Sequence, residues 1–331
     1  TIGIGGASMK RYVWLISFFL VFILPNLIFI GIHKEPTTES IPTFVATDND
    51  DQMQKVVVDK KGEIREMYLD DYVLCVLLGE VPADFEIEAL KAQALATRTY
   101  TLRNILKQSK HENADVCADA SCCQAYVEPE DFLINGGKQE SLDKMKTAVF
   151  STTDEVLTYA GELIDATYFS CSGGMTEDAV AVWGTDVPYL RSVASPGEEG
   201  TRHYISNFYY SIDDFLSKLG LQTGTPLSNE SIVTTHTNGN GVATLTIDNY
   251  VFTGTQIRSI FDLPSTAFEV SVLGDNILMQ VKGYGHRVGM SQYGAEAMAL
   301  SGKNYEEILI HYYPGTRLEQ LSKEDMKAIF D

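Results

Sequence analysis

The stretch GEVPADFEIEALKAQALATRTY at residues 79–100 decides how the rest of the chain is arranged. A glutamate and a proline lead into a run that repeats alanine and places other side chains at the three- and four-residue spacing of a helix. We expect this helix to run from Phe85 to Lys107, with Asp84 as its N-cap. Because alanine side chains are small, other segments can approach closely, so we expect a tightly packed, central helix.

Glu80 stands just before this helix and has two possible roles. It is either a structural acid near a helix end or the working carboxyl group of an enzyme. Glu86 and Glu88 already supply negative charge to the first turn, where the helix dipole favours it. Glu80 is therefore free for acid and base chemistry, with Gln93 and Arg98 on the helix as candidates to frame it.

Composition limits the class of protein. The chain has 331 residues, of which 44% are hydrophobic and 10% aromatic, so it can bury one large core or two modest ones. Its formal net charge is −20. Nucleic-acid binding requires a basic face that displaces counterions, so we expect no nucleic-acid partner.

The amino-terminal residues differ from the rest. Residues 1–8 have the character of a cloning scar or a leader, and residues 9–33 contain an uncharged apolar run at 12–32. At about 1.5 Å per residue this run crosses a hydrocarbon core of roughly 30 Å, so we expect an uncleaved transmembrane anchor rather than a signal peptide. Lys10 and Arg11 predict that everything after the span lies outside the cytoplasm.

The remaining chain predicts one folded region. Prolines, hydroxyl residues and acids make 34–55 a linker, and the folded region is expected at 56–331. Alternating β runs around Asn-Gly pairs predict a smaller lobe at about 205–275. The fold class is therefore α+β: a mixed α/β, two-lobed catalytic region with a central Ala-rich helix and a cleft, preceded by one transmembrane helix.

Six blocks of the chain resemble, in order, those of a known family. They are GEVPADFEIEALKAQALATRTY at 79–100, CQAY at 123–126, ATYFSCSGG at 166–174, VWG at 182–184, GYGHRVGMSQYGA at 283–295 and HYYPGT at 311–316. The family is that of stage II sporulation protein D, the membrane-anchored peptidoglycan lytic transglycosylases of endospore formers. The resemblance covers about residues 56–320.

The resemblance implies cleavage of the β-1,4 bond between N-acetylmuramic acid and N-acetylglucosamine, which leaves a 1,6-anhydro end, with Glu80 as the catalytic residue. One carboxyl group suffices because the attacking C6 hydroxyl belongs to the muramic acid itself, whereas ordinary glycosidases need a second group. Glu80 must start neutral, which calls for an apolar or partly buried setting that raises its pKa.

The resemblance also implies partners and a location. The partners are peptidoglycan glycan strands, a cell-wall amidase (stage II sporulation protein P) and a membrane protein (stage II sporulation protein M), acting during engulfment. The location is the mother-cell membrane, with the catalytic region extracytoplasmic and facing the forespore.

Two glycine-rich turns, SCSGG and GYGHRVGMSQYG, carry polar side chains and can bring backbone donors close to a sugar. Tight-turn geometry explains the glycines alone, but not the polar residues gathered there. The candidate substrate-binding residues are Gln93, Arg98, Ser170, Ser172, His286, Ser291, Gln292 and Tyr293. His286 either orients substrate or supports Glu80, and Tyr293 and Trp183 can stack on sugar faces.

The segment HENADVCADASCC at 111–123 carries His111, Cys117, Cys122 and Cys123, the ligand types of a Cys₃His zinc site. Adjacent cysteines need an unusual turn to ligate together, so a three-ligand site with one of the pair is equally credible. A disulfide from Cys117 to Cys122 or Cys123 is the alternative in an oxidising compartment. Zinc here would brace the loop; we expect no cofactor for the chemistry.

Two functions of other classes stay open. One is a thiol hydrolase with Cys171 as nucleophile and His286 or His311 as base. The other is a non-catalytic glycan-binding protein that activates a cell-wall amidase, since relatives in the wider family modify amidases.

Overall fold

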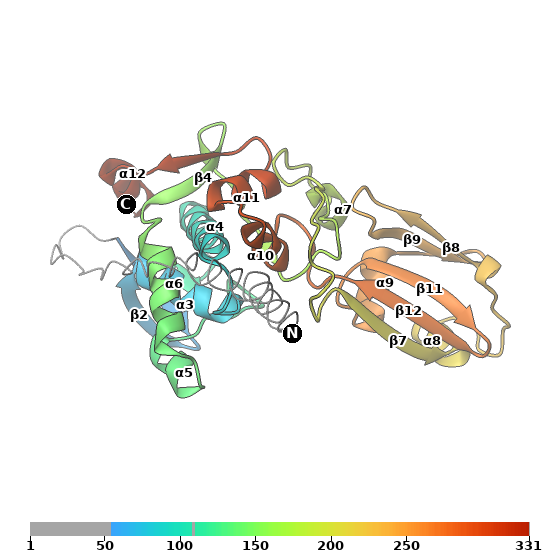
Figure 1. The fold of residues 1–331 in the computed structure, drawn as a ribbon. Coiled ribbons are helices and arrows are strands. Elements are labelled where there is room, and N and C mark those ends of the chain that lie inside the picture. Colours follow the sequence, from blue (N-terminus) through green and yellow to red (C-terminus); the bar gives the residue numbers. More distant parts are fainter. Residues whose placement is uncertain (1–53, 108–109, 331) are drawn as a thin grey trace, which may run out of the picture. The chain divides into compact units, whose positions relative to one another are not determined.

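The computed structural model describes residues 54–107 and 110–330 (Figure 1). The predicted leader at 1–8, the anchor at 9–33 and all but the end of the linker at 34–55 lie outside the described residues. Among the helices of the described ranges, none combines the length and apolar character that crossing a membrane requires.

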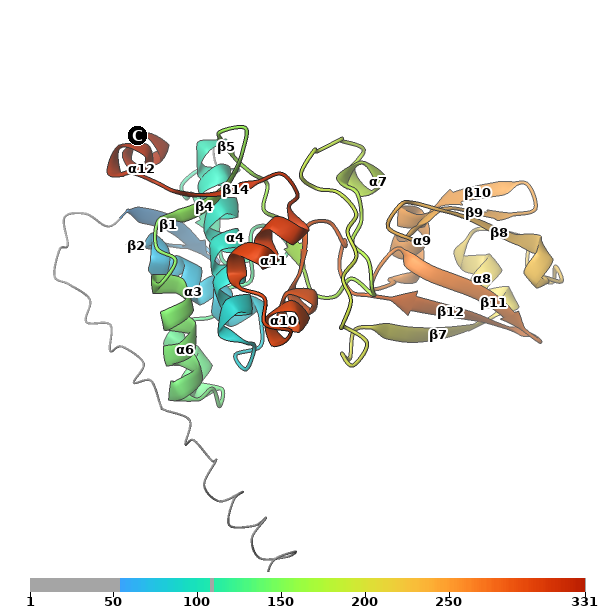
Figure 2. The ribbon, with the colours of Figure 1, turned by 45° about the horizontal axis from the view of Figure 1, so that its top comes forward.

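Helix α4 (Ile87–Leu106) is the centre of the helical part. Its alanines at 89, 92, 94 and 96 are at most 2% exposed. Around it pack α3 (Leu69–Glu80), α6 (Gln139–Phe150), α10 (Gln292–Leu300), α11 (Tyr305–Tyr312) and α12 (Lys323–Phe330), as Figures 1 and 2 show. The central Ala-rich helix is therefore confirmed, because small side chains let neighbours approach on several sides.

The expectation that Asp84 caps this helix is wrong. Helix α4 begins at Ile87, its N-cap is Glu86, and no side chain of the N-cap residue bonds back to the helix. Instead the Glu296 carboxylate accepts the backbone N–H of Glu86 at 2.6 Å. A carboxylate supplied by α10 thus satisfies a donor at the helix start.

Short sheets border the helices. The hairpin of β1 (Lys55–Lys60) and β2 (Glu63–Tyr68) is antiparallel, and β3 (Val116–Cys117) runs parallel to β1. Strand β4 (Glu155–Tyr159) lies between β5 (Glu162–Leu163) and β14 (Arg317–Gln320), while β6 (Tyr168–Phe169) pairs in parallel with β13 (Met290–Ser291). Two short helices, α5 (Pro129–Ile134) and α7 (Ala179–Trp183), complete this part.

Residues 205–282 have a hydrophobic cluster of their own. The first sheet has the order β11 (Ala267–Leu273), β12 (Asn276–Lys282), β7 (Ile205–Ser211), and the second β10 (Tyr250–Thr253), β9 (Val242–Ile247), β8 (Ile232–His236). The helical elements are α8 (Ile212–Lys218), η2 (Asn229–Ser231) and α9 (Gly254–Phe261). The smaller lobe was expected at 205–275, but its first sheet also includes β12, which ends at Lys282. The chain is of mixed α+β class.

Candidate active site

Glu80 is the last residue of α3 and is half-buried. The backbone N–H of Ala125 donates to its Oε1 at 2.8 Å, and Nε2 of Gln292 donates to its Oε2 at 3.3 Å. Burial raises the pKa of Glu80, while these two hydrogen bonds oppose the rise. The position at a helix C-terminus also disfavours the charged form. The site therefore holds a carboxyl group that is neutral at higher pH than an ordinary glutamate.

The segment that carries Ala125 approaches the helix end at the one residue that allows it. A Cβ added to Gly79 would lie 2.8 Å from the Tyr126 nitrogen and 2.9 Å from the Ala125 carbonyl carbon. Only glycine leaves room for this backbone contact. Gly79 thus makes the hydrogen bond from Ala125 to Glu80 possible.

The two glycine-rich turns meet each other, and the second one brings Gln292 to Glu80. Ser170 accepts the backbone N–H of Tyr293 at 3.0 Å through its carbonyl oxygen, next to the pairing of β6 with β13. Ser291 is the N-cap of α10, and its hydroxyl accepts from the N–H of Gly294 at 3.2 Å. This cap starts the helix at Gln292, whose side chain reaches Glu80.

Glu198 links the two glycine-rich turns through hydrogen bonds, and the sequence did not single it out. Its side chain is fully buried. Oε2 accepts from the backbone N–H and the hydroxyl of Ser172, both at 2.8 Å, and Oε1 accepts from Ser291 at 2.6 Å and from Ser195 at 2.7 Å. One carboxylate thus ties SCSGG to the cap of α10. In sequence, the acid pair in SPGEEG is indistinguishable from a solvated loop charge.

The same contacts correct the expectation for Ser172 and Ser291 as direct substrate ligands. Both side chains are fully buried, and both hydroxyls donate to Glu198. They therefore position the turns rather than face a sugar.

Arg98 also departs from expectation. Its guanidinium is fully buried, lies 2.7 Å from Asp70 and donates to the carbonyl of Thr152 at 2.6 Å. Gln93 is 1% exposed; its Nε2 donates to Thr97 at 3.3 Å, and its Oε1 has no hydrogen-bond partner in the described part of the chain. Arg98 is therefore used in packing, and the amide of Gln93 bonds to Thr97 rather than to Glu80.

His286 lies in an aromatic cluster rather than beside Glu80. Its ring centroid is 5.3 Å from that of Trp183 and 5.6 Å from that of Phe169, and its Nδ1 accepts the Val288 N–H at 3.1 Å. Burial, followed by the nearby Arg258, lowers the pKa of His286 to about 4. The ring is therefore neutral at physiological pH.

A cavity of about 440 Å³ lies where the SCSGG turn meets β11 and β12, and its walls include Gly174, Lys282 and Arg287. Glu80 and Gln292 do not line it. The candidate site is therefore defined by the contacts of the Glu80 carboxylate, not by the cavity.

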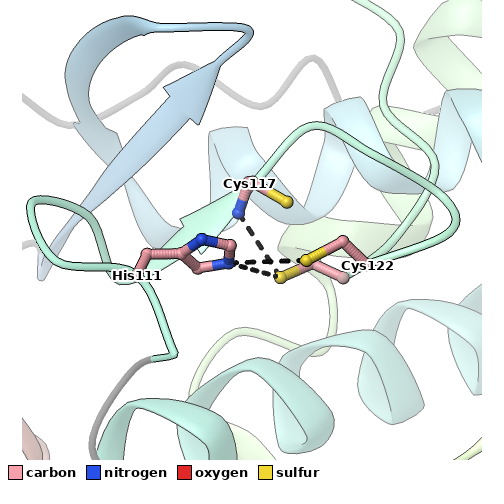
Figure 3. Close-up of side chains that lie close together, drawn as sticks. His111, Cys117 and Cys122 are labelled. Atoms are coloured by element: carbon pink, nitrogen blue, oxygen red, sulfur yellow. Dashed lines mark hydrogen bonds between the residues drawn. The ribbon is translucent and has the colours of Figure 1, made fainter.

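His111, Cys117, Cys122 and Cys123 converge in the structure. Figure 3 labels the first three of them. One ligand atom from each lies within 4.8 Å of all the others, and His111 Nε2 is 3.2 Å from the Cys123 Sγ and 3.8 Å from the Cys122 Sγ. The adjacent cysteines do point to one place, so the turn that we considered unusual is present. All five cysteines lie in the described residues, and none forms a disulfide.

These four groups fit a metal ion by donor type and spacing. Zinc–ligand bonds of about 2.0–2.3 Å put tetrahedral ligand atoms roughly 3.3–3.8 Å apart, so only a small contraction is needed. Burial, followed by the contact with Cys122, raises the pKa of Cys117 to about 12. A metal ion would displace the protons of the cysteine thiols, because cysteine binds metals as the thiolate.

The geometry opposes the thiol-hydrolase alternative. Cys171 is fully buried, and its Sγ lies 3.2 Å from the Glu198 Oε2. Burial and the Glu198 charge raise the pKa of this thiol to about 12, which disfavours the nucleophilic thiolate. His311 is engaged elsewhere, with Nε2 2.7 Å from the Ala194 carbonyl oxygen.

Comparison with known proteins places these residues in a family. Residues 58–159 match the family model described as stage II sporulation protein. The chain is 33% identical to stage II sporulation protein D of Bacillus amyloliquefaciens over 94% of this chain and 96% of that protein, and 37% identical to that of Bacillus subtilis over 78% and 76%. An amidase enhancer of Bacillus subtilis is 28% identical over 73% of this chain and 39% of its own length. The chain belongs to the stage II sporulation protein D family.

Proposed function

We propose that this chain is a peptidoglycan lytic transglycosylase that acts during sporulation. The observation that carries the proposal is the Glu80 carboxyl group, half-buried, with a raised pKa and two hydrogen-bond donors. Ordinary glycoside hydrolysis uses two carboxyl groups. A reaction whose nucleophile belongs to the substrate needs only one.

The steps balance without water. The neutral Glu80 carboxyl protonates the glycosidic oxygen, and the bond from that oxygen to C1 of N-acetylmuramic acid breaks with its electron pair leaving on the N-acetylglucosamine. The C6 hydroxyl of the same muramic acid then bonds to C1 and gives its proton to Glu80, which forms the 1,6-anhydro ring. The donors from Ala125 and Gln292 stabilise the carboxylate that exists between the two transfers.

We further propose that His111, Cys117, Cys122 and Cys123 hold a structural zinc ion. The zinc ion would serve only as a structural cross-link between these residues. Cys123 continues directly into Gln124 and Ala125, so a fixed Cys123 holds the N–H that faces Glu80. Gln124 fastens the same segment, because its Nε2 donates to the Tyr168 hydroxyl at 2.7 Å.

The setting is also a proposal. We infer a single-pass anchor at residues 9–33, an extracytoplasmic catalytic region and peptidoglycan strands as substrate. The amidase stage II sporulation protein P and the membrane protein stage II sporulation protein M are the proposed partners. The likeness to an amidase enhancer supports a relation to a cell-wall amidase and keeps amidase activation as the second candidate function.

The test is digestion of amidase-treated glycan strands, with product masses read by mass spectrometry. The wild-type chain is expected to release anhydro-muramic ends, one water lighter than hydrolysed ends, and Glu80→Gln to release none. Glu162→Gln, at an exposed position of β5, is the matched control. Release by Glu80→Gln at the wild-type rate would refute the mechanism.

Two further outcomes separate the alternatives. Loss of release in Cys171→Ala with Glu80→Gln still active would favour the thiol hydrolase. Stimulation of an amidase by a chain that never releases anhydro ends would favour the activator.

A further inference from the structure

The cavity of about 440 Å³ borders two sheets, and Glu80 does not line it. Its walls include His236, the last residue of β8, and Phe268 and Glu269 of β11. Each of these strands is the outermost of its three-stranded sheet, and among the described residues no other strand pairs with its free edge. The cavity therefore meets two open sheet edges.

The open edge of β11 presents unpaired backbone groups. Val272 donates its N–H to Oδ1 of Asn229 at 2.8 Å, so this N–H points away from β12. Since backbone groups alternate between the two sides of an antiparallel strand and the register with β12 is unbroken, those of Phe268 and Val270 point the same way. In the described part of the chain, neither residue has a backbone hydrogen bond on that side. An extended peptide would supply the partners by adding a strand.

The lack of a partner matters most at Phe268. This residue is 2% exposed, so its backbone is largely shielded from solvent. Buried backbone N–H and C=O groups are nearly always paired in folded proteins. A peptide strand at this edge would therefore pair groups that no other part of the described chain pairs.

Opposite charges stand beside the same edge. Lys282 lines the cavity and lies opposite Ala267 in the sheet, and Glu269 follows two residues along β11. At about 3.4 Å per residue, the two positions are about 7 Å apart along the strand. Neither side chain forms an ion pair with another described residue. Both charges are therefore available to a ligand.

Arg287 adds a second cation to the cavity wall. Its guanidinium donates to three carbonyl oxygens, including that of Gly239 at 2.6 Å, which fixes its position. Nη1 lies 3.7 Å from Oε2 of Glu177 and has no hydrogen-bond partner in the described ranges. Glu177 offsets part of this charge, so Lys282 is the cation that a carboxylate would bind.

We infer that the cavity and the open edge of β11 bind an extended peptide with a free carboxyl end. The peptide adds as a strand antiparallel to β11, its carboxylate faces Lys282, and a cationic side chain two residues earlier faces Glu269. A peptidoglycan stem peptide with a diamino acid before two terminal D-alanines has this charge pattern. The stem peptide as the source rests on the proposed function, whereas the peptide site does not.

The experiment measures peptide binding apart from glycan cleavage. The probe is Nα-acetyl-L-lysyl-D-alanyl-D-alanine, and its binding to the full chain is measured by calorimetry. Lys282→Met, which keeps a long side chain and removes its charge, is expected to weaken binding roughly ten- to hundredfold, the range of a hydrogen bond to a charged group. The same loss is expected when the probe carries a C-terminal amide in place of its carboxylate.

Lys327→Met is the matched control, because Lys327 is an exposed lysine of α12 that does not line the cavity. It is expected to leave the affinity for the probe unchanged. No binding by the wild-type chain, equal affinity for the acid and the amide, or an equal loss in Lys327→Met each overturns the peptide site.

Strand addition has a readout of its own. With the probe bound, amide hydrogen exchange at Phe268 and Val270 is expected to slow, because their N–H groups gain partners. The amide of Val272, which already donates to Asn229, is the internal reference. Unchanged exchange at both Phe268 and Val270 would overturn the pairing with β11.

The peptide site and the proposed function fail separately. A chain that binds the probe through Lys282 but releases no anhydro ends would keep the peptide site and refute the transglycosylase. A chain that releases anhydro ends and does not bind the probe would keep the reaction and refute the site. Equal or tighter binding of the all-L peptide would refute the stem peptide as the source and favour the carboxyl-terminal tail of a protein.

Discussion

Gly79→Ala tests whether a backbone contact sets the acidity of Glu80. The new Cβ would lie 2.8 Å from the Tyr126 nitrogen, 2.9 Å from the Ala125 carbonyl carbon and 3.2 Å from the Ala125 Cβ. Two of these are backbone atoms, so the 124–126 segment must move. In a free helix the same change would stabilise by about 1 kcal/mol, whereas overpacking costs about 1–3 kcal/mol. We expect net destabilisation by up to about 2 kcal/mol.

The effect on catalysis follows from the displaced N–H group of Ala125. Its hydrogen bond favours the carboxylate form and lowers the pKa of Glu80, so its loss raises that pKa. A hydrogen bond to a charged group contributes about 1.5–3 kcal/mol, which corresponds to about one to two pH units. Because Glu80 must begin protonated, the high-pH limb of kcat/KM should move upward by up to that amount.

The assay is the rate of anhydro-end release from amidase-treated strands between pH 4 and 9, beside the melting temperature of each variant. Gly200→Ala is the control, because an added Cβ there meets nothing within 4 Å and the residue is exposed. A Gly79→Ala chain that loses stability while its high-pH limb stays in place, or moves to lower pH, would refute the reasoning.

Three further predictions concern stability. Burial raises the pKa of Glu80 in the folded chain above its value in the unfolded chain. The stabilising contribution of protonated Glu80 is therefore complete below the unfolded-state pKa and is lost as pH rises through the folded-state pKa. Glu80→Gln should melt at a higher temperature than wild type at pH 7, and the difference in melting temperature should close near pH 4. No gap at pH 7 would contradict this. A strong chelator or Cys117→Ser should remove one zinc per chain, counted by elemental analysis, and lower the melting temperature by more than about 5 °C; a metal-free wild type would count against it. Arg98→Met should destabilise by about 3–5 kcal/mol in urea, because Asp70 is left buried and unpaired, whereas Arg65→Met at an exposed pair should cost under about 1 kcal/mol.

Local pattern was enough for several elements. The alanine spacing predicted α4 almost to its ends. The Asn-Gly pairs predicted the β8–β9 hairpin. These features depend on neighbouring residues and backbone conformation, which the sequence states directly.

The candidate site was predictable only in part. The motif resemblance singled out Glu80 and Gln292, and the structure brings their side chains together although they are 212 residues apart. It could not tell that Arg98 pairs with Asp70, since a helical pattern shows which residues share a face but not what covers that face. It also could not single out Glu198 among the acids of a loop.

The sequence by itself determined the positions of α4 and of the β8–β9 hairpin, the family, the identity of the candidate acid and the ligand types of the cysteine cluster. Tertiary structure decided which polar groups serve packing and which remain for a ligand. Ser172, Ser291 and Arg98 became structural because buried hydroxyl and guanidinium groups must find partners. Tyr284, whose ring lies beside that of His203, remained 49% exposed. That division depends on which segments meet, a property of the folded chain rather than of any short stretch of it.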